Sequence, residues 1–401
     1  MPKPLAFGRK HLAIPGPSVM PDRVLRAMHQ AAPNIYEGDL ITLTETVFRD
    51  LNVIARNSGH AVIYIGNGHA AWEASLVNLF SKGDSLLALV TGRFGQSWAD
   101  TAVALGIDVQ VLDFGTQSAV EAERIAVALQ ADTQHKIKAV MTVQTDTATS
   151  VCNDIALIRK VLNDTGHPAL LMVDCIASFA CEPFDMDELG VDVMVTGCQK
   201  GLMTPPGLAI VYISDKVWPL HEKAELNTPY WNWEPRARPA FYAAQFCGTA
   251  PTHHLYGIRE ALDMLLEEGM ENVWHRHRVQ AECVWAAVQA WSSDDVLQLN
   301  VPDEAHRSRV VTCVVTHGDL AARLRQWCEE EAGVTLGIGL NPVRTGPPSE
   351  SLFRIGHMGH LNPHSLLGTL ACIETGLNVL HPGGVGKGVE AASAVIASHA
   401  R

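Results

Sequence analysis

The sequence lacks three features that would point to a membrane, to nucleic acid or to secretion. It has no run of 18 apolar residues, so we expect no membrane span. Its net charge of −13 gives no basic face, which makes nucleic acid and anionic membranes poor partners. The N-terminal MPKPLAFGRKH contains no apolar core of a secretory signal. The nine cysteines form no C-x-x-C pair and lie in apolar stretches, which indicates reduced, packed thiols in a cytoplasmic protein.

From about residue 60, short apolar runs alternate with amphipathic segments. The runs predict strands, and the segments between them predict helices. Strands are expected at residues 61–66, 85–90, 108–114, 138–143, 169–174, 192–197 and 208–214, and helices at 69–80, 94–105, 120–129 and 154–162. Strands this apolar are typical of a sheet covered on both faces. We therefore predict an α/β fold with a mainly parallel, doubly wound sheet.

The pattern changes after about residue 273. A long helix is expected before this point, at 251–269. From there on, helices are expected at 272–290, 318–330 and 363–379, and strands at 309–315 and 352–357. This order is typical of a smaller α+β domain. We predict an N-terminal arm at 1–12, a large domain at 13–273 and a small C-terminal domain at 274–401.

Ligands of an open parallel sheet bind beyond the carboxyl ends of its strands, so the loops there are the candidate site. The turn at 66–70, with sequence GNGHA, could cradle a phosphate at a helix start, or could simply be a tight turn. Phe94 could lie against a planar ring, or pack at the start of a helix. The hydroxyl-rich loop 144–150 could bind a ligand or cap a helix.

Three charged residues lie at the ends of apolar strands or within one. Asp174 ends a strand and would need a cation or a protonated ring nitrogen beside it. Lys200 follows another strand, where burial would lower its pKa and make it a nucleophile. Arg354 could hold a carboxylate with its two-pronged donor set. Each of them could instead be structural: a salt bridge, a lysine reaching water, or a packed arginine.

Taken together, these features fit pyridoxal 5′-phosphate. That cofactor needs a phosphate cradle, a stacking ring, a buried acid for its ring nitrogen and a lysine for its aldehyde. An arginine for the substrate carboxylate completes the set. The same lysine, once released, can move the proton between the substrate Cα and the cofactor.

The chain also resembles a known family over nearly its whole length, from IPGPSVMPDRVL (14–25) to GVGKGVEAA (384–392). The resemblance is to the class V, fold-type I aminotransferases, in the serine/alanine–glyoxylate branch. It is carried by GNGHAAWEASLVN (66–78), TATSVCNDI (147–155), HPALLMVDCIASF (167–179), DMDELGVDVMVTGCQKGLMTPPGLAIV (185–211) and FRIGHMGHLN (353–362).

The resemblance implies a role for each matching residue. Lys200 corresponds to the lysine that forms the Schiff base, and Asp174 to the partner of the ring nitrogen. The phosphate would be held by Gly68, His69, Ala70 and Gln199, and by Thr249 of a second subunit, which implies a homodimer. Phe94 takes the place of the stacking aromatic, Thr147 lies near the cofactor's O3′, and Arg354 holds the substrate α-carboxylate.

The function that this resemblance implies is a ping-pong transamination. The donor would be serine or alanine, and the acceptor glyoxylate or pyruvate. A pyridoxamine–pyruvate aminotransferase is the principal alternative, because its C-terminal region looks similar to residues 384–396. An aspartate–glyoxylate aminotransferase is less favoured.

Two further alternatives are disfavoured by the residues present. A cysteine desulfurase needs a mobile cysteine, whereas Cys328 lies in a helical pattern. A non-enzymatic metal-binding module would need more ligands than His357 and His360, which have no acid or cysteine at ligand spacing, so we expect no metal.

Overall fold

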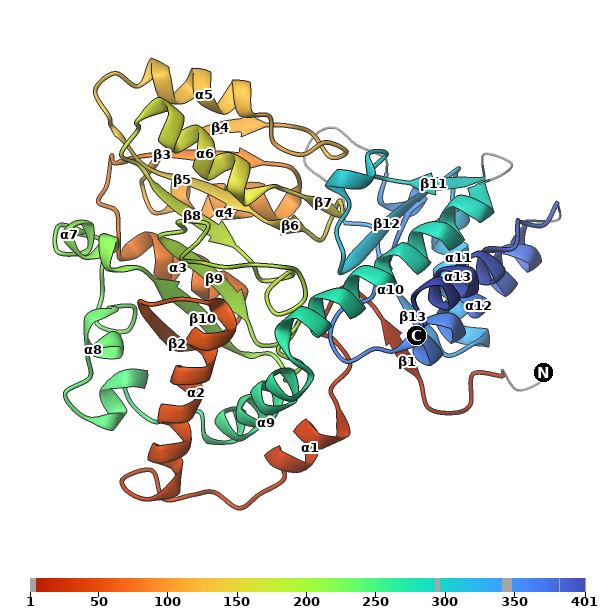
Figure 1. Cartoon of the computed structure of the whole chain (residues 1–401), viewed down its shortest axis with the longest axis horizontal. Helices are drawn as coiled ribbons and strands as arrows, with labels where there is room; N and C mark the ends of the chain where they lie inside the picture. Colours follow the sequence, from red (N-terminus) through yellow and green to blue (C-terminus); the bar gives the residue numbers. More distant parts are fainter. Residues whose placement is uncertain (1–4, 293–295, 341–347, 382, 401) are drawn as a thin grey trace.

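The computed structural model describes residues 5–292, 296–340, 348–381 and 383–400, and its larger part is built on a seven-stranded sheet (Figure 1). The strands, in chain order, are β2 (His60–Gly66), β3 (Ser85–Val90), β4 (Asp108–Asp113), β5 (Ile137–Val143), β8 (Leu170–Asp174), β9 (Val193–Gly197) and β10 (Gly207–Ile213). Their spatial order is β2-β10-β9-β8-β5-β3-β4. The pairs from β9 to β4 are parallel, and β10 is antiparallel to both its neighbours. The predicted mainly parallel sheet is confirmed, with β10 as the exception.

Helices cover both faces of this sheet. The helices are α1 (Asp22–Met28), α2 (Asp39–Ala55), α3 (Gly68–Val77), α4 (Arg93–Ala104), α5 (Ala122–Ala131), α6 (Ile155–Thr165), α7 (Trp218–His221), α8 (Glu234–Ala237) and α9 (Thr252–Glu268). Alternate residues of one strand point into separate cores: in β8, Leu171 and Val173 pack with α2, α5, α6 and α9, whereas Met172 packs with α3 and α4. Burial on both sides explains why the strands are continuously apolar.

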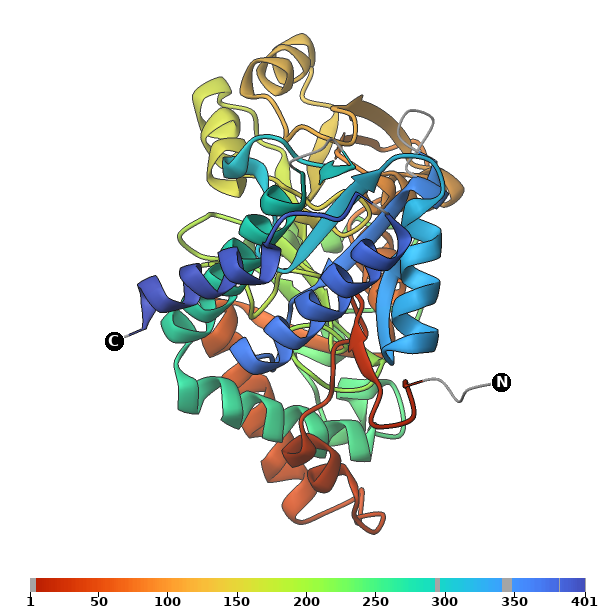
Figure 2. The same cartoon turned by 90° about the vertical axis from the view of Figure 1, so that its right-hand side faces the viewer.

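The second sheet has five strands in the order β1-β13-β14-β12-β11. They are β1 (His11–Ala13), β11 (Leu297–Leu299), β12 (Val311–Thr316), β13 (Val334–Ile338) and β14 (Leu352–Gly356). Its helices are α10 (Met270–Trp291), α11 (Leu320–Glu331), α12 (Pro363–Leu380) and α13 (Gly388–His399), which share one hydrophobic core with it. Figure 2 shows these helices from the side, with the N-terminal segment passing beneath them.

Two structural elements cross the predicted domain limits. The limit at residue 273 falls inside α10, a continuous helix that runs from the large sheet to the small one (Figure 1). The limit at residue 12 falls inside β1, which pairs in parallel with β13. The division into an arm and two domains stays a prediction, and the first strand of the chain belongs to the C-terminal sheet.

Among the described residues, no helix combines the length and the apolar character that crossing a membrane requires.

Candidate active site

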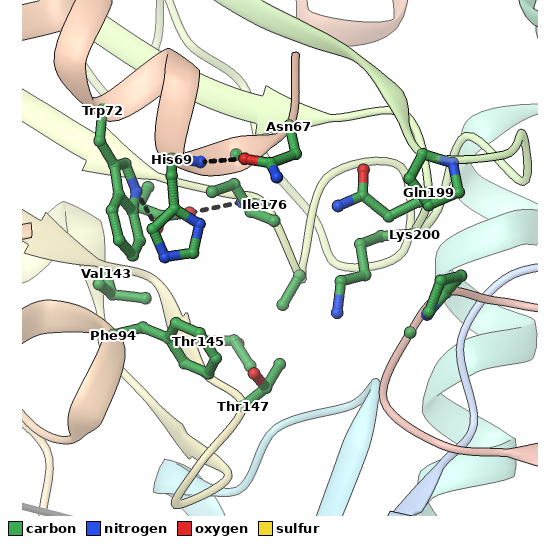
Figure 3. Close-up of a pocket in the computed structure, with 16 residues that line it drawn as sticks. Asn67, His69, Trp72, Phe94, Val143, Thr145, Thr147, Ile176, Gln199 and Lys200 are labelled. Atoms are coloured by element: carbon green, nitrogen blue, oxygen red, sulfur yellow. Dashed lines mark hydrogen bonds between the residues drawn. The ribbon is translucent and has the colours of Figure 1, made fainter. Parts of the chain in front are cut away.

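A cavity of about 310 Å³ lies at the carboxyl edge of the seven-stranded sheet (Figure 3). This volume is at the lower end of the range for small-molecule sites, roughly 300–1,000 Å³. It is lined by Gly16, Pro17, Asn67, Gly68, His69, Trp72, Phe94, Val143, Thr145, Thr147, Asp174, Ile176, Ala177, Gln199, Lys200 and Pro206. Seven residues predicted from the sequence therefore meet here: Gly68, His69, Phe94, Thr147, Asp174, Gln199 and Lys200.

Lys200 reaches the cavity from the loop that follows β9. In Figure 3 its side chain and that of Gln199 come from one side, opposite Trp72, His69 and Phe94. The Lys200 Nζ donates a hydrogen bond to the carbonyl of Pro15. Burial, with a smaller effect of the Arg354 charge, lowers the pKa of Lys200 to about 8. The lysine is therefore closer to its neutral, nucleophilic form than one in water.

The N-terminal segment closes one wall of the cavity, which the sequence did not predict as part of the site. Gly16 has φ +102°, and a Cβ there would lie 2.3 Å from Lys200 Nζ, so the position requires glycine. Ser18 ties the segment to the lysine loop through its hydroxyl, which donates to the Lys200 carbonyl at 2.7 Å. The segment thus holds the loop from which Lys200 extends.

Asp174 ends β8, lines the same cavity and is 3% exposed. Its Oδ1 accepts the Ile176 N–H at 2.6 Å, and its Oδ2 accepts the Trp72 indole N–H at 2.7 Å. Burial raises the pKa of Asp174 to about 7, against the effect of these donors. The acid therefore needs a cation beside it to stay fully ionised at neutral pH.

The start of α3 and Gln199 form the polar end of the cavity. The Asn67 side chain caps α3 by accepting the His69 N–H at 3.1 Å. A Cβ at Gly68 would lie 2.4 Å from the Ile176 side chain, so a larger residue would displace either the turn or this side chain. Among the described residues, the buried Oε1 of Gln199 has no hydrogen-bond partner. A helix start suits a bound anion, and Gln199 would contribute its Nε2 N–H groups, because its Oε1 can only accept hydrogen bonds.

Asp146 holds the region that carries Phe94 and was not predicted as a site residue. Its buried carboxylate accepts the N–H groups of Phe94 at 2.8 Å and Gly95 at 3.2 Å, at the start of α4. Burial raises the pKa of Asp146. The Phe94 ring lines the cavity, as does Thr147, so Asp146 fixes the backbone on which the aromatic ring is placed.

Arg354 lies next to the cavity rather than in its lining. Its guanidinium donates to the carbonyls of Thr147 at 2.8 Å and Ile338 at 2.7 Å. Burial lowers the pKa of Arg354 to about 10, and among the described residues it forms no salt bridge. Backbone carbonyls orient this arginine without neutralising it, which leaves its charge for a ligand.

Ala70 and Thr249 do not line the cavity. Ala70 lies in the first turn of α3, where its N–H bonds the Asn67 carbonyl at 2.9 Å. Thr249 is exposed, in the segment between α8 and α9. Within the described part of the chain, Thr249 therefore lies outside the cavity lining.

His357 and Cys328, considered for the metal-binding and desulfurase alternatives, do not line the cavity. Both ring nitrogens of the buried His357 are hydrogen-bonded, to the Thr312 hydroxyl at 2.9 Å and the Arg309 carbonyl at 3.1 Å. Cys328 is fully buried in the core around α11. His357 is thus a packed core residue, and Cys328 is not placed to act as a mobile nucleophile.

A lysine and a buried acid facing one cavity, with an anion-binding helix start at its end, fit pyridoxal phosphate and define an enzyme of fold type I that uses this cofactor. The family model described as Aminotransferase class-V matches residues 20–356. The chain belongs to this family, as predicted, and is a pyridoxal phosphate-dependent aminotransferase.

Individual relatives match over almost the full length. A serine–glyoxylate aminotransferase of Methylorubrum extorquens is 38% identical, with 97% of this chain and 96% of that protein covered. An L-aspartate–glyoxylate aminotransferase of Paracoccus denitrificans is 33% identical, with 94% of each chain covered. The crystal structure of pyridoxamine–pyruvate aminotransferase from Mesorhizobium loti has a TM-score of 0.88 at 26% identity, with 100% of this chain and 98% of that chain covered.

Proposed function

We propose that this aminotransferase moves the amino group of a small L-amino acid, serine or alanine, to a small 2-oxo acid, glyoxylate or pyruvate, by a ping-pong mechanism. The observation that carries the proposal is the placement of Lys200 and Asp174 on one cavity, with Arg354 next to it. The similarity to serine–glyoxylate aminotransferase over 97% of the chain supports glyoxylate as acceptor.

The residues of the cavity would each contact a different part of the cofactor. The start of α3, with Gly68, His69 and Ala70, would hold the phosphate together with Gln199. Phe94 would lie against the ring, Thr147 would be near its hydroxyl, and Asp174 would hold the ring nitrogen in its protonated form. When bound, pyridoxal phosphate supplies an electron-withdrawing ring that stabilises the negative charge left on the substrate Cα.

Lys200 would serve first as the attachment point and then as the base. Its lowered pKa leaves a usable fraction of neutral amine at neutral to mildly alkaline pH. In that form its Nζ would take the proton from the substrate Cα and return it on the cofactor side. The carbonyl of Pro15, which accepts a hydrogen bond from this Nζ, would give the free amine a fixed place in the cavity.

Arg354 would bind the α-carboxylate that both substrates share. A guanidinium held by two backbone carbonyls is already oriented before the substrate arrives, which reduces the entropy lost on binding. One arginine would thus serve both halves of the ping-pong cycle.

We further propose that the enzyme is a cytoplasmic homodimer with each cofactor site at the subunit interface. Thr249 is exposed and away from the cavity of its own chain, which is compatible with its serving the site of a second subunit. The absence of C-x-x-C pairs and the burial of most cysteines fit a reducing compartment.

A matrix of amino donors against glyoxylate and pyruvate tests the proposed substrates. Serine or alanine with glyoxylate should give the highest kcat/KM. Aspartate as the best donor would instead support the activity of the Paracoccus relative. Rapid formation of free pyridoxal from pyridoxamine and pyruvate would support the second candidate, which the likeness to the Mesorhizobium enzyme over the whole chain favours.

A further inference from the structure

Trp72 makes a contact with Asp174 that gives the tryptophan more than a packing role. It lies in α3, one turn after the start of the helix, and is 1% exposed. Its Nε1 donates to Asp174 Oδ2 at 2.7 Å, across 102 positions of sequence. Figure 3 shows the indole beside His69 at the edge of the cavity, with this hydrogen bond dashed.

The indole is itself held on several sides. Trp98 stacks on it with ring centroids 6.2 Å apart and an angle of 16° between the planes. The His69 ring lies at 4.4 Å and the Phe94 ring at 6.4 Å. These rings pack around the Trp72 indole and restrict its rotation, which keeps its N–H directed at the Asp174 carboxylate.

Each oxygen of Asp174 accepts one hydrogen bond from the protein. Oδ1 accepts the backbone N–H of Ile176 at 2.6 Å, which would be present with almost any side chain at that position. The hydrogen bond to Oδ2 comes from the side chain of Trp72, so it is lost if residue 72 has no N–H group at this place. Donors to a buried carboxylate favour its charged form, whereas burial disfavours it.

We propose that Trp72 is a positioning residue of the reaction, whose indole N–H fixes the plane of the Asp174 carboxylate and keeps this acid ionised for the cofactor's ring nitrogen. The inference rests on the proposed role of Asp174. It also assigns two tasks to α3: its first residues would hold the phosphate, and Trp72 one turn later would hold the acid. One rigid helix would then set the distance between the two ends of the cofactor.

The test compares Trp72→Phe with Trp98→Phe. Both replace a buried indole by a phenyl ring, but among the described residues the Nε1 of Trp98 has no hydrogen-bond partner. Loss of a hydrogen bond to a charged group should weaken binding of pyridoxal phosphate to the apoenzyme about 10- to 100-fold in Trp72→Phe. In Trp98→Phe a phenyl ring still packs against the Trp72 indole and the Trp72 donor remains, so the dissociation constant should change less than about 3-fold.

A second readout separates positioning from packing. The pH midpoint of the visible absorbance of the bound cofactor should rise in Trp72→Phe, because a less firmly protonated ring withdraws fewer electrons from the linked lysine nitrogen. It should stay unchanged in Trp98→Phe. The other titratable groups acting on Asp174 are Asp146, Lys200 and Cys175, and neither variant removes them.

Equal effects of the two variants on both readouts would overturn the proposal. If Asp174→Asn leaves cofactor affinity and the absorbance midpoint as in the wild type, the assumed role of Asp174 is wrong instead. Should Trp72→Phe not fold, Trp72→His keeps a ring N–H in a smaller ring. An absorbance midpoint near the wild-type value then supports the donor role, and one matching that of Asp174→Asn contradicts it.

Discussion

At the scale of single residues, burial in one cavity disfavours the charged forms of both Lys200 and Asp174. Removal from water lowers the pKa of the lysine to about 8 and raises the pKa of the acid to about 7. Each charge in turn opposes the effect of burial on the other. A cavity that shifts both groups toward neutrality is typical of a catalytic site rather than of a structural ion pair.

The lowered pKa of Lys200 predicts how cofactor uptake depends on pH. Only the neutral amine attacks an aldehyde, and its fraction rises as the pH passes upward through the pKa. Covalent uptake of pyridoxal phosphate by the apoenzyme should therefore rise about tenfold per pH unit below pH 8 and level off above it. Stopped-flow absorbance from pH 6 to 10 measures this rate.

Arg354 provides the control for that profile. Its charge is one cause of the lowered lysine pKa, so Arg354→Gln should move the plateau to higher pH. A rate in the wild type that keeps rising to pH 10 would show a lysine with an ordinary pKa, and the interpretation would fail.

Arg354 also predicts a kinetic pattern with the two substrates. Because both present the same carboxylate, Arg354→Gln should raise KM for the amino donor and for the oxo acid, each about 10- to 100-fold. Initial-rate kinetics with each substrate varied in turn measures the effect. Arg325→Gln, which removes a nearby charge of the same sign, should leave both values within about 3-fold. Unchanged KM values in Arg354→Gln would make that arginine purely structural.

At the scale of elements, α3 and α4 place the two ends of the cavity. Asn67 caps α3, and Asp146, from the short strand β6 (Thr145–Asp146), accepts the first N–H groups of α4. Among the described strands, β6 pairs with β7 (Val151–Cys152) alone, and Thr147 follows it directly. Helix starts held by polar side chains are well defined in position, which a cofactor site requires.

The close approach at Gly68 predicts an element-scale effect. In Gly68→Ala the methyl group would collide with the Ile176 side chain at 2.4 Å, so either this side chain, which also lines the cavity, or the start of α3 must shift. We expect cofactor affinity to fall at least about tenfold and stability to fall by about 1–3 kcal/mol. Titration of the apoenzyme and thermal unfolding measure the two effects.

A second helical glycine gives the matched control. Gly368 lies inside α12, and a Cβ there would meet no atom within 4 Å. Gly368→Ala should therefore stabilise the protein by roughly 0.5–1 kcal/mol and leave cofactor binding unchanged. If Gly68→Ala behaved in the same way as this control, the turn at α3 would not be a close-fitting cradle.

At the scale of the whole molecule, the two sheets are joined by more than the chain connection. β1 places the N-terminal segment in the small sheet, and the following residues pass Lys200 on the way to the large one. The buried Glu182 accepts hydrogen bonds from Thr145 in the cavity wall at 3.0 Å and from the Ser308 hydroxyl at 3.2 Å. The position of the small sheet is therefore linked to the wall of the site.

The exposed position of Thr249 predicts a site shared between subunits. If Thr249 serves the partner's phosphate, Thr249→Ala should weaken cofactor affinity about tenfold without loss of stability, because the residue is exposed in its own chain. Sedimentation should show a dimer.

Hybrid dimers give the decisive measurement. In a heterodimer of Lys200→Ala and Thr249→Ala subunits, a shared site restores one native cofactor site for every two chains. A site built within one chain restores none. Absorbance titration at a cofactor concentration that leaves Thr249→Ala homodimers largely empty distinguishes the two outcomes.

The sequence predicted most of the elements that carry the site, because they are apolar runs or amphipathic segments. Strands 85–90 and 352–357 and helix 363–379 agree with β3, β14 and α12 within one residue. Strand β1 was not predicted, because three residues carry too little periodicity to be recognised. Asp146 and Trp72 were missed for another reason: each acts through a contact with a residue far along the chain.

By itself, the sequence determined the α/β fold through strand periodicity and the cofactor chemistry through the residues that follow each strand, which are local properties of the chain. The family came from the resemblance of its motifs over nearly the whole length. Only the tertiary structure decided that Trp72 holds Asp174, that Gly16 makes room for Lys200, and that Arg354 is oriented by two carbonyls. These depend on distances between segments that are remote in sequence, and packing sets those distances.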